Sequence, residues 1–388
     1  ELIFDDLDSL FSPPKLKRAS NDLSQGYYPG SRWLNTTTKK MWTCVDNTTS
    51  AAVWSQGGGS IDVYENGSSV VAGASRLDFK DLNVENPSGT IAALYLDLPA
   101  ICNGRLTLTS GTPVTTSDVT GATTVYWTPF NGSKVALYDG TRWKLYAYTE
   151  RSLSVPSAVF RIYDVYLYDN SGSLTLEATA WDSGGQTSAA ITGGTNATPV
   201  VITSNAHGLS VGDMVGINSM AGLTAPNGKI WYVSATTTNT FTLEGSVGNG
   251  AYTSGGTWYK VPASRTTGLT AQDGVYVKSG ATTRRYLGTL MTTSTSGQCE
   301  DSTNRRFVWN NYNRCLRGLL AFDTTDLWTY TTAAFRAQNA STTIGVGQVQ
   351  LLAGLQTDIL IAQNYNYRFT SNGNWTATGI GINRTTVN

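Results

Sequence analysis

Charge is scarce in this sequence, and neither sign is in excess. Only 14% of the 388 residues are charged, and 27 lysines and arginines balance 27 aspartates and glutamates. Binding to nucleic acid or to an anionic membrane surface needs a local excess of basic side chains, so we predict no nucleic-acid partner. The paired arginines Arg284-Arg285 and Arg305-Arg306 are interpreted as solvated strand edges or turns.

Cysteine and histidine are also rare. The sequence holds four cysteines, Cys44, Cys102, Cys299 and Cys315. They form neither the C-x-x-C pairs of a zinc site nor a dense disulfide scaffold, so we expect free buried thiols, with a Cys299–Cys315 disulfide as the alternative. The single histidine, His207, has no cluster of Cys, Asp or Glu at ligand spacing. We interpret His207-Gly208 as a turn, and we predict no metal and no cofactor.

Long apolar runs and catalytic motifs are missing. No run approaches the roughly 20 residues that span a bilayer, which predicts no membrane insertion. Neither a nucleophile elbow nor a phosphate-binding glycine motif occurs. A glycosidase needs two carboxylates facing each other across a groove, and no pattern pairs the candidates, which are Asp139, Glu150, Asp164, Glu300 and Asp301. Asp139 belongs to a turn, Asp164 to a strand and the others to expected loops. We therefore predict no catalytic residue and no enzyme.

Glycine and aromatic residues are abundant. The chain has 40 Gly, 11 Trp, 20 Tyr and 10 Phe, together with many Thr and Ser. This composition is typical of many short strands joined by tight turns, with aromatic rings filling the core. The fold class that it predicts is all-β, built from several antiparallel modules.

The clearest local pattern is a hairpin around Asp139-Gly140. Apolar and polar residues alternate on both sides of this dipeptide, which readily supplies the positive φ angles of a tight turn. With a second turn at Asn131-Gly132, residues 125–127, 134–138 and 142–148 are predicted to form one antiparallel meander. Further along, alternation is expected to place Phe160, Ile162, Asp164, Tyr166 and Tyr168 on a single face of a strand.

The first quarter of the chain is expected to hold three small parts. Residues 1–25 cannot bury enough apolar surface to fold alone, so they either anchor the chain to a partner or form a frayed terminus. Residues 26–60 are predicted to be a small β-module, and 61–98 a transition of linker and strands.

The remainder is expected to be a β-sandwich with an insertion. Residues 99–187 and 259–388 are predicted to form one antiparallel, jelly-roll-like sandwich. Residues 188–258 are predicted to be an autonomous insert, because the strand pattern continues on either side of the flexible flanks Gly184-Gly185 and Gly255-Gly256.

Three stretches carry distinctive orders of aromatic, glycine and turn residues. The order of Gly26-Tyr27, Trp33, Trp42 and Ala51–Trp54 resembles a small β-module near the N-termini of phage fibre and tail proteins. The insert, through Val200–Thr203, His207-Gly208-Leu209, Val211-Gly212-Asp213 and Phe241–Leu243, is similar to a small β-barrel that is common in phage structural proteins. The sandwich resembles a C-terminal region of tail or head fibres, on the segments YWTPFNGSKVALYDGTRW, TRRYLGT, RRFVWNNYNR, LWTYTTAAFR and GIGIN.

The resemblance implies a structural protein of the virion, a fibre or spike. Its N-terminal part would bind a capsid, portal or tail protein, and the C-terminal sandwich would face the host surface. The low charge and the small N-terminal module suggest apolar surface buried in a homo-oligomer, a trimer. The alternatives are a capsid decoration or head-fibre protein without receptor binding, or a surface-polysaccharide depolymerase.

Aromatic residues near the C-terminus are the predicted glycan-binding candidates. Their flat rings with polar edges suit stacking on sugars. They are Trp328, Tyr330, Tyr365, Tyr367 and Trp375.

Overall fold

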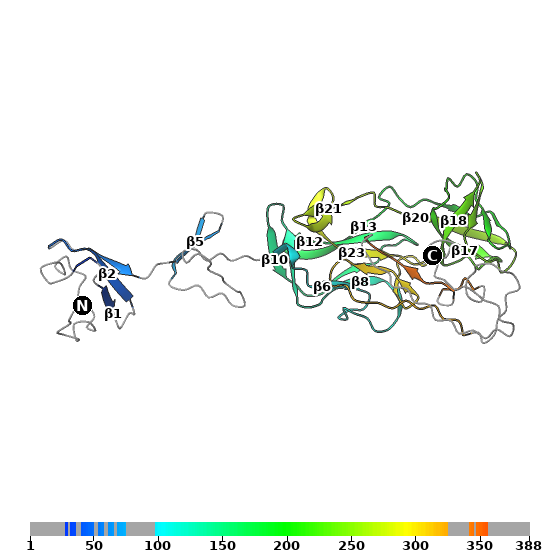
Figure 1. Cartoon of the computed structure of the whole chain (residues 1–388). Coiled ribbons are helices and arrows are strands. Elements are labelled where there is room, and N and C mark those ends of the chain that lie inside the picture. The colour runs from blue at the N-terminus through cyan, green and yellow to red at the C-terminus, as the bar shows by residue number, and fades with distance from the viewer. Residues whose placement is uncertain are drawn as a thin grey trace, which may run out of the picture. The chain divides into compact units, whose positions relative to one another are not determined.

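The computed structural model divides the chain into two compact units, Glu1–Tyr95 and Leu96–Asn388. It describes residues 28–29, 32–35, 40–49, 53–57, 61–65, 68–74, 98–324, 341–344 and 347–355. The predicted tail at 1–25 lies outside these residues. Figure 1 shows that the described parts are built of strands, which confirms the all-β prediction.

The first unit contains two small antiparallel sheets. One has the order β1 (Arg32–Asn35), β2 (Lys40–Asp46) and β3 (Val53–Gly57). The other is a hairpin of β4 (Ile61–Glu65) and β5 (Ser68–Ala74). Trp33 and Trp42 are directly opposite each other across β1 and β2. The strands expected from the turn and aromatic pattern of 26–60 are therefore present.

The second unit is organised around a six-stranded sheet. Its strands follow the order β13 (Ser173–Ala180), β12 (Ile162–Asn170), β23 (Ala281–Met291), β22 (Val275–Lys278) and β21 (Leu269–Gln272), and β26 (Val308–Asn310) also pairs with β23. Because β12 is central, all residues from Ile162 to Leu167 are buried. Ile162, Asp164, Tyr166 and Tyr168 alternate along β12 and so share a face, as predicted, while Phe160 precedes the strand and the opposite face is buried as well.

Three smaller sheets and a short helix accompany the main sheet in this unit. One sheet has the order β11 (Arg151–Ser154), β8 (Thr124–Pro129), β6 (Gly104–Thr107), and the second pairs β10 (Trp143–Ala147) with β9 (Lys134–Tyr138). The third has the order β27 (Gln350–Leu351), β25 (Arg305–Arg306), β24 (Cys299–Asp301), β7 (Val119–Ala122). The helix is the 3₁₀ turn η2 (Leu98–Ala100). Strands from these sheets and from the main sheet contribute to one large apolar core, which includes the fully buried Trp127 and Tyr166.

The hairpin prediction at Asp139-Gly140 is confirmed, but the meander prediction was wrong. β9 and β10 pair around the turn, with Tyr138 opposite Trp143. β8 does not join them, because its two edges are already occupied by β6 and β11. At Asn131, where φ is 57°, the chain crosses from one sheet to the next, and Asn103 Nδ2 donates to Asn131 O at 2.7 Å.

All four cysteines are free. Cys44, Cys102 and Cys299 are buried, while Cys315 is half-buried. Burial raises the pKa of Cys102 to about 11 and that of Cys299 to about 12. The prediction of free thiols is confirmed, and the alternative Cys299–Cys315 disulfide was wrong.

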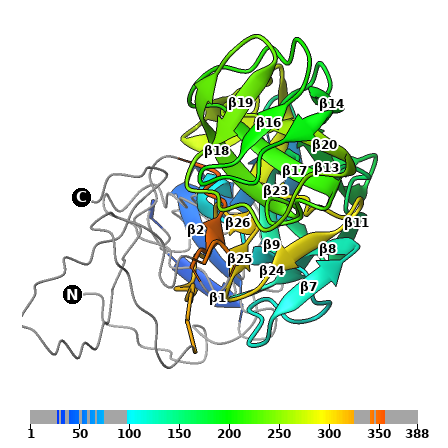
Figure 2. The same cartoon turned by 90° about the vertical axis from the view of Figure 1, so that its right-hand side faces the viewer.

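The expected insert contains a closed sheet. Its seven strands follow the order β14 (Ser188–Ala190), β20 (Ser254–Val261), β17 (Met214–Ala221), β18 (Lys229–Thr236), β19 (Thr240–Leu243), β16 (Val201–Thr203) and β15 (Gly193–Gly194). The two edge strands β14 and β15 belong to one continuous segment, so the sheet closes on itself as a small barrel. Figure 2 shows this barrel above the other sheets of the unit.

His207 has the structural role that the sequence suggested. Its side chain is buried, and Nδ1 accepts a hydrogen bond from the Leu209 N–H at 3.0 Å. Nε2 therefore carries the proton and donates to Thr240 O at 3.0 Å. Gly208 has φ of +64°, as a turn requires.

The barrel is packed against the main core, and Gly255 and Gly256 are not a linker. Both glycines lie inside β20, which continues to Val261. On the neighbouring strand, Gly216 lies under the ring of Phe160, and a side chain there would collide with that ring. The interface between the barrel and the other sheets of the second unit, which we call the sandwich, is therefore close and partly apolar.

Candidate functional site

Asp164, one of the candidate carboxylates, and Arg285, one of the paired arginines, are buried parts of the framework. Arg285 is only 1% exposed and donates to the carbonyl oxygens of Pro99, Ile101 and Ala136 at 2.7 to 3.1 Å. It was predicted to be solvated, which was wrong, because β23 is covered on both faces at this position. Asp164 is 2% exposed and forms a bidentate ion pair with Arg265, at 2.6 and 3.0 Å.

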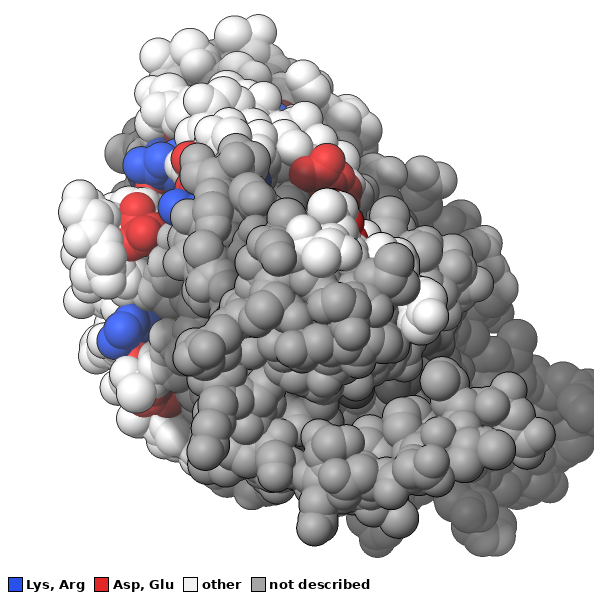
Figure 3. All heavy atoms as spheres, turned by 90° about the vertical axis from the view of Figure 1, so that its left-hand side faces the viewer, with Lys and Arg blue, Asp and Glu red and all other residues white. Residues whose placement is uncertain are grey.

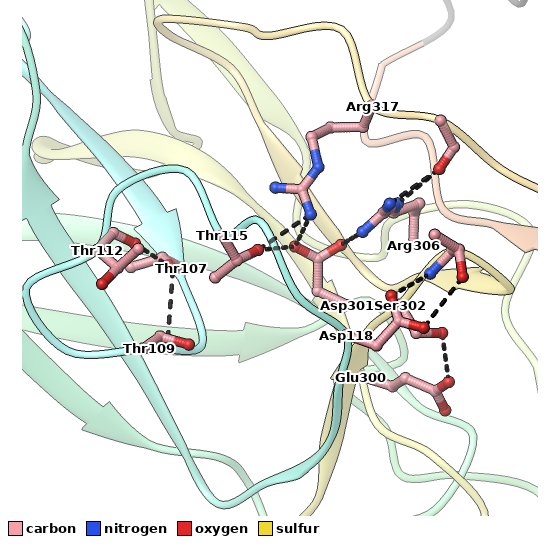
Figure 4. A network of polar contacts seen from close by, with 12 residues as sticks. Thr107, Thr109, Thr112, Thr115, Asp118, Glu300, Asp301, Ser302, Arg306 and Arg317 are labelled. Atoms are coloured by element: carbon pink, nitrogen blue, oxygen red, sulfur yellow. Dashed lines mark hydrogen bonds and ion pairs between the residues drawn. The ribbon is translucent and has the colours of Figure 1, made fainter.

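Glu300 and Asp301 lie on strand β24 and not on loops, which corrects their predicted placement. Figure 4 shows Asp301 between Arg306 and Arg317, at 2.9 and 3.1 Å. Thr115 Oγ1 lies 3.4 Å from the same carboxylate. Glu300 accepts hydrogen bonds from Ser302, at 2.7 Å, and from Arg305, at 3.2 Å. The Arg305-Arg306 pair is therefore held in ion pairs, contrary to the prediction of a solvated edge.

The other two candidate carboxylates stabilise loops. Asp139 Oδ1 accepts the N–H groups of Thr141 and Arg142, as its predicted turn role requires. Glu150 accepts hydrogen bonds from Ser110 Oγ, Thr128 Oγ1 and the Gly111 N–H. All five candidate carboxylates are thus engaged by nearby donors.

An extended segment after β26 reverses the usual placement of charge and apolar side chains. From Arg314 to Leu320 exposed and half-buried residues alternate. Arg317 points inward to Asp301, and Gly318 O accepts hydrogen bonds from Arg306 at 2.8 and 3.1 Å. Three of the outward side chains are large and apolar: Leu316 is 97% exposed, Leu320 57% and Phe322 62%, while Arg314 at the start of the segment is exposed as well. We call Leu316, Leu320 and Phe322 the apolar strip.

A hollow lined by three tyrosines is the best candidate for a binding site. It encloses about 350 Å³ between the β9–β10 hairpin and the ends of β12 and β23. In Figure 1 this is the end of the second unit opposite the barrel. The rim of the hollow combines aromatic, acidic, basic and amide groups. We call this hollow the tyrosine hollow. Tyr138, Asp139, Lys144, Tyr146, Tyr168, Asp169, Asn170, Ser171, Thr283 and Arg284 line it.

Strand register brings these side chains together. In the hairpin, Lys144 is opposite Leu137 and Tyr146 is opposite Val135, so Lys144 and Tyr146 share one face with two buried residues. Tyr168 is near the end of β12, where the central strand emerges from its buried part. The tyrosines are half-buried. Their rings are therefore fixed by packing while part of each surface reaches solvent.

Hydrogen bonds hold the rim in place. Tyr146 Oη donates to Asp169 Oδ2 at 3.0 Å, and Asp169 Oδ1 accepts the Gly172 N–H at 2.7 Å. Burial, together with the Asp169 carboxylate, raises the pKa of the Tyr146 phenol. Lys144 Nζ lies 2.9 Å from Asp139 Oδ2. Hydrogen bonds from the turn amides and from Lys144 hold the pKa of Asp139 well below its usual range.

One arginine connects the hollow to the main sheet. The Arg284 guanidinium lies over the Tyr168 ring, 4.6 Å from its centroid, and Nε donates to Glu177 at 2.7 Å. Lys278 also pairs with Glu177. Burial opposes ionisation of Glu177, but these cationic donors lower its pKa overall. The guanidinium of Arg284 on the rim is thus already paired with the carboxylate of Glu177.

A second hollow, of about 530 Å³, lies beside Tyr148 and Glu150. It has a single tyrosine, and the phenol of Tyr148 is engaged with Asn103 O. Glu150 is held by three donors. This hollow offers fewer groups for recognising a ligand than the tyrosine hollow does.

The predicted glycan-binding residues Trp328, Tyr330, Tyr365, Tyr367 and Trp375 lie outside the described residues. Their assignment stays a prediction. The residues of the tyrosine hollow were not proposed from the sequence. Local alternation and the turns at Asp139 and Asn170 were visible signals, but nothing in the sequence shows that the two turns meet.

Within the part of the chain that the structure describes, no group of three or more Cys, His, Asp or Glu side chains could hold a metal ion. In the same residues, no helix is long and apolar enough to cross a membrane. Among the charged side chains visible in Figure 3, both signs occur without an extended area of one sign. No protein-family model and no curated protein matches the chain.

Proposed function

We propose that this chain is the subunit of a bacteriophage virion appendage, a fibre or spike that assembles as a homotrimer and attaches to the host surface. The apolar strip is the observation that carries the proposal. In an extended surface segment, a monomer gains stability when leucines point inward and arginines outward. Arg317 and the apolar strip have the opposite arrangement, with Arg317 bonded to Asp301 and Leu316 97% exposed.

The strip is firmly held on the protein. Arg306 binds Gly318 O, and the Leu320 N–H donates to Thr303 O at 2.8 Å. Leu351, 50% exposed, lies on β27, which pairs with β25 next to Thr303. Exposed apolar groups on a fixed backbone can bury surface in a partner at little cost in conformational entropy. An identical subunit is the proposed partner, because most oligomers are symmetric assemblies of one chain.

The resemblance of residues 26–54, of the insert and of the sandwich segments to phage proteins supports the virion. In this proposal the N-terminal part binds a capsid, portal or tail protein. A capsid decoration or head-fibre protein is the alternative within the same class. A depolymerase is less well supported, because the candidate carboxylates Asp139, Glu150, Asp164, Glu300 and Asp301 are all engaged in structural hydrogen bonds.

Light scattering on the full chain tests the assembly. We expect a trimer in the native protein and a monomer in the double variant Leu316→Asp, Leu320→Asp, because two charges would be buried in the interface. Val211→Asp is the matched control: Val211 is 63% exposed but lies on the insert. A native monomer at all concentrations, or a double variant that still associates, would contradict the proposal.

Electron microscopy of particles labelled at Asn388 separates the variants of the proposal. A fibre or spike places the label at the outer end of an appendage in few copies. A decoration protein places it over the capsid surface in many copies.

A further inference from the structure

The tyrosine hollow shares no residue with the apolar strip and has a chemistry of its own. We propose that it binds a neutral saccharide, one or two sugar units of a surface polysaccharide. This inference rests on the proposed function, because it gives host attachment a site and a ligand class.

The aromatic lining points to sugars. The apolar C–H faces of a pyranose pack on flat rings, and three tyrosine side chains, Tyr138, Tyr146 and Tyr168, surround the hollow. Tyrosine combines a large contact area with a hydroxyl edge, and few rotatable bonds are lost on binding. One face of Tyr168 is covered by Arg284, so the rings present defined faces and edges.

The polar rim suits hydroxyl groups. The carboxylates of Asp139 and Asp169 accept hydrogen bonds, and Lys144 and Arg284 donate them. The exposed Asn170 amide can do both. A saccharide presents many hydroxyls that act as donors and acceptors together, which a mixed rim can match and an apolar ligand cannot.

Charge balance favours a neutral ligand. Lys144 is paired with Asp139 at 2.9 Å, and Arg284 with Glu177 at 2.7 Å. Asp169 accepts the phenol of Tyr146 and the Gly172 amide. An anionic sugar would have to compete with Asp139 and Glu177 for the two cations, and would approach the Asp169 carboxylate. A neutral sugar needs no ion pair to be broken.

Size and rigidity also fit. About 350 Å³ is near the lower end of the range of roughly 300–1,000 Å³ for ligand sites, so the hollow accommodates a short part of a polymer. Asp139 fixes the β9–β10 turn through two backbone amides, and Asp169 fixes the β12–β13 turn through one. The rim is therefore organised before a ligand arrives.

Saturation-transfer NMR and calorimetry on the full chain test the site. The probes are neutral oligosaccharides of glucose, galactose and mannose, two to six units long, with uronic-acid oligosaccharides as the anionic comparison. We expect at least one neutral series to bind. Tyr146→Ala and Tyr168→Ala should each weaken that binding by about tenfold, as the loss of an aromatic contact implies.

Matched variants keep the test decisive. Tyr276→Ala removes an exposed tyrosine of β22 outside the hollow and should leave binding unchanged. Should a tyrosine variant unfold, Asn170→Ala, at an exposed position, should still weaken binding several-fold. Tyr146→Phe keeps the ring and should bind better than Tyr146→Ala does.

Three results would contradict the proposal that the tyrosine hollow binds a neutral saccharide. They are the absence of binding by any neutral probe, binding that all hollow variants retain, or binding of anionic probes alone with strong salt dependence. Light scattering distinguishes these results from failure of the proposed function. A monomeric native protein contradicts the trimer but leaves saccharide binding to be measured, while a trimer without saccharide binding refutes the hollow alone.

Discussion

The barrel insert and the surrounding sandwich are stabilised by different means. In the barrel, the cluster of buried apolar residues includes Phe241, Trp258 and Leu223, and the buried polar side chains are small or neutral, such as Ser204, Ser246 and His207. The sandwich buries charged groups next to its apolar core, including Asp164, Arg285 and Asp301. One region is held mainly by packing, and the other also by ion pairs.

The difference follows from how far apart in the sequence the paired segments of each region are. The barrel pairs strands within one stretch of sequence. The sandwich joins segments that are far apart: Arg265 binds Asp164 and also donates to Gly354 O at 2.6 Å. A buried charge without its partner is costly. Ion pairs between distant segments therefore disfavour arrangements in which those segments are misplaced.

Removing Asp164 should have the largest effect. Asp164→Ala removes a buried carboxylate and leaves the half-buried Arg265 without its ion-pair partner, so we expect the free energy of unfolding to fall by about 3–5 kcal/mol. The equivalent change in the insert, Asp213→Ala, breaks the more exposed pair with Lys260 and should cost only about 0–1 kcal/mol. Urea denaturation of both variants measures the comparison. Equal losses would show that the two regions do not differ in this way.

Deleting residues 188–258 and joining the ends by a short Gly-Ser link should lower the free energy of unfolding less than Asp164→Ala does. We expect cooperative unfolding to persist, because β13, β12 and β23 pair outside the deleted stretch. Stability should fall by about 2 kcal/mol, since Phe160 loses part of its cover.

Gly216→Val in the full chain is the companion variant for the deletion. It keeps both regions but forces a side chain against the Phe160 ring, at a cost of about 1–3 kcal/mol. Loss of cooperative unfolding in the deletion variant would contradict the predicted bounds of the insert, 188–258. An unchanged free energy of unfolding in Gly216→Val would contradict the close packing of Gly216 against Phe160.

Acid should weaken the sandwich through Glu177. The folded-state pKa of Glu177 is lowered, since the hydrogen bonds from Lys278 and Arg284 outweigh its burial. Its contribution is therefore complete above the unfolded pKa, about 4.3, and is lost as pH falls through the lower folded value. We expect Glu177→Gln to be less stable than the native protein at pH 7, with a difference that shrinks below pH 4. A constant difference down to pH 2 would contradict this.

The smallest expected effect concerns thiol reactivity in the second unit. Burial raises the pKa of Cys102 to about 11 and that of Cys299 to about 12, so neither should react with a thiol reagent in the folded state. The half-buried Cys315 should react first. Mass spectrometry after brief alkylation identifies the modified residue. Early labelling of Cys102 or Cys299 would indicate that the sandwich opens more readily than its ion pairs suggest.

Local features of the fold were accessible from the sequence. The Asp139-Gly140 hairpin and the His207-Gly208 turn depend on residues next to each other in the chain, and both were predicted correctly. The meander was not, because alternation identifies a strand without identifying its neighbours. Only the structure shows that β6 and β11 occupy both edges of β8.

The candidate site and the buried charges could not be predicted, for a related reason. Arg285 was expected in solvent because arginines usually are, and its acceptors Pro99 and Ala136 are far away in sequence. The tyrosine hollow likewise joins Tyr146 with Tyr168 and Arg284 across separate strands. Such sites depend on the pairing of distant segments, which a local pattern does not contain.

The pairing of β14 with β20 has a consequence for the rate of folding. Ser188 lies opposite Tyr259, so the two ends of the long excursion leave the barrel side by side. Bringing β12 and β23 together across an unstructured loop of this length would carry a loop-closure entropy that grows with the logarithm of its length. Once the barrel has formed, the remaining connection behaves like a short loop. We therefore expect early formation of the barrel to speed the long-range pairing of β12 with β23, a type of contact that otherwise slows folding.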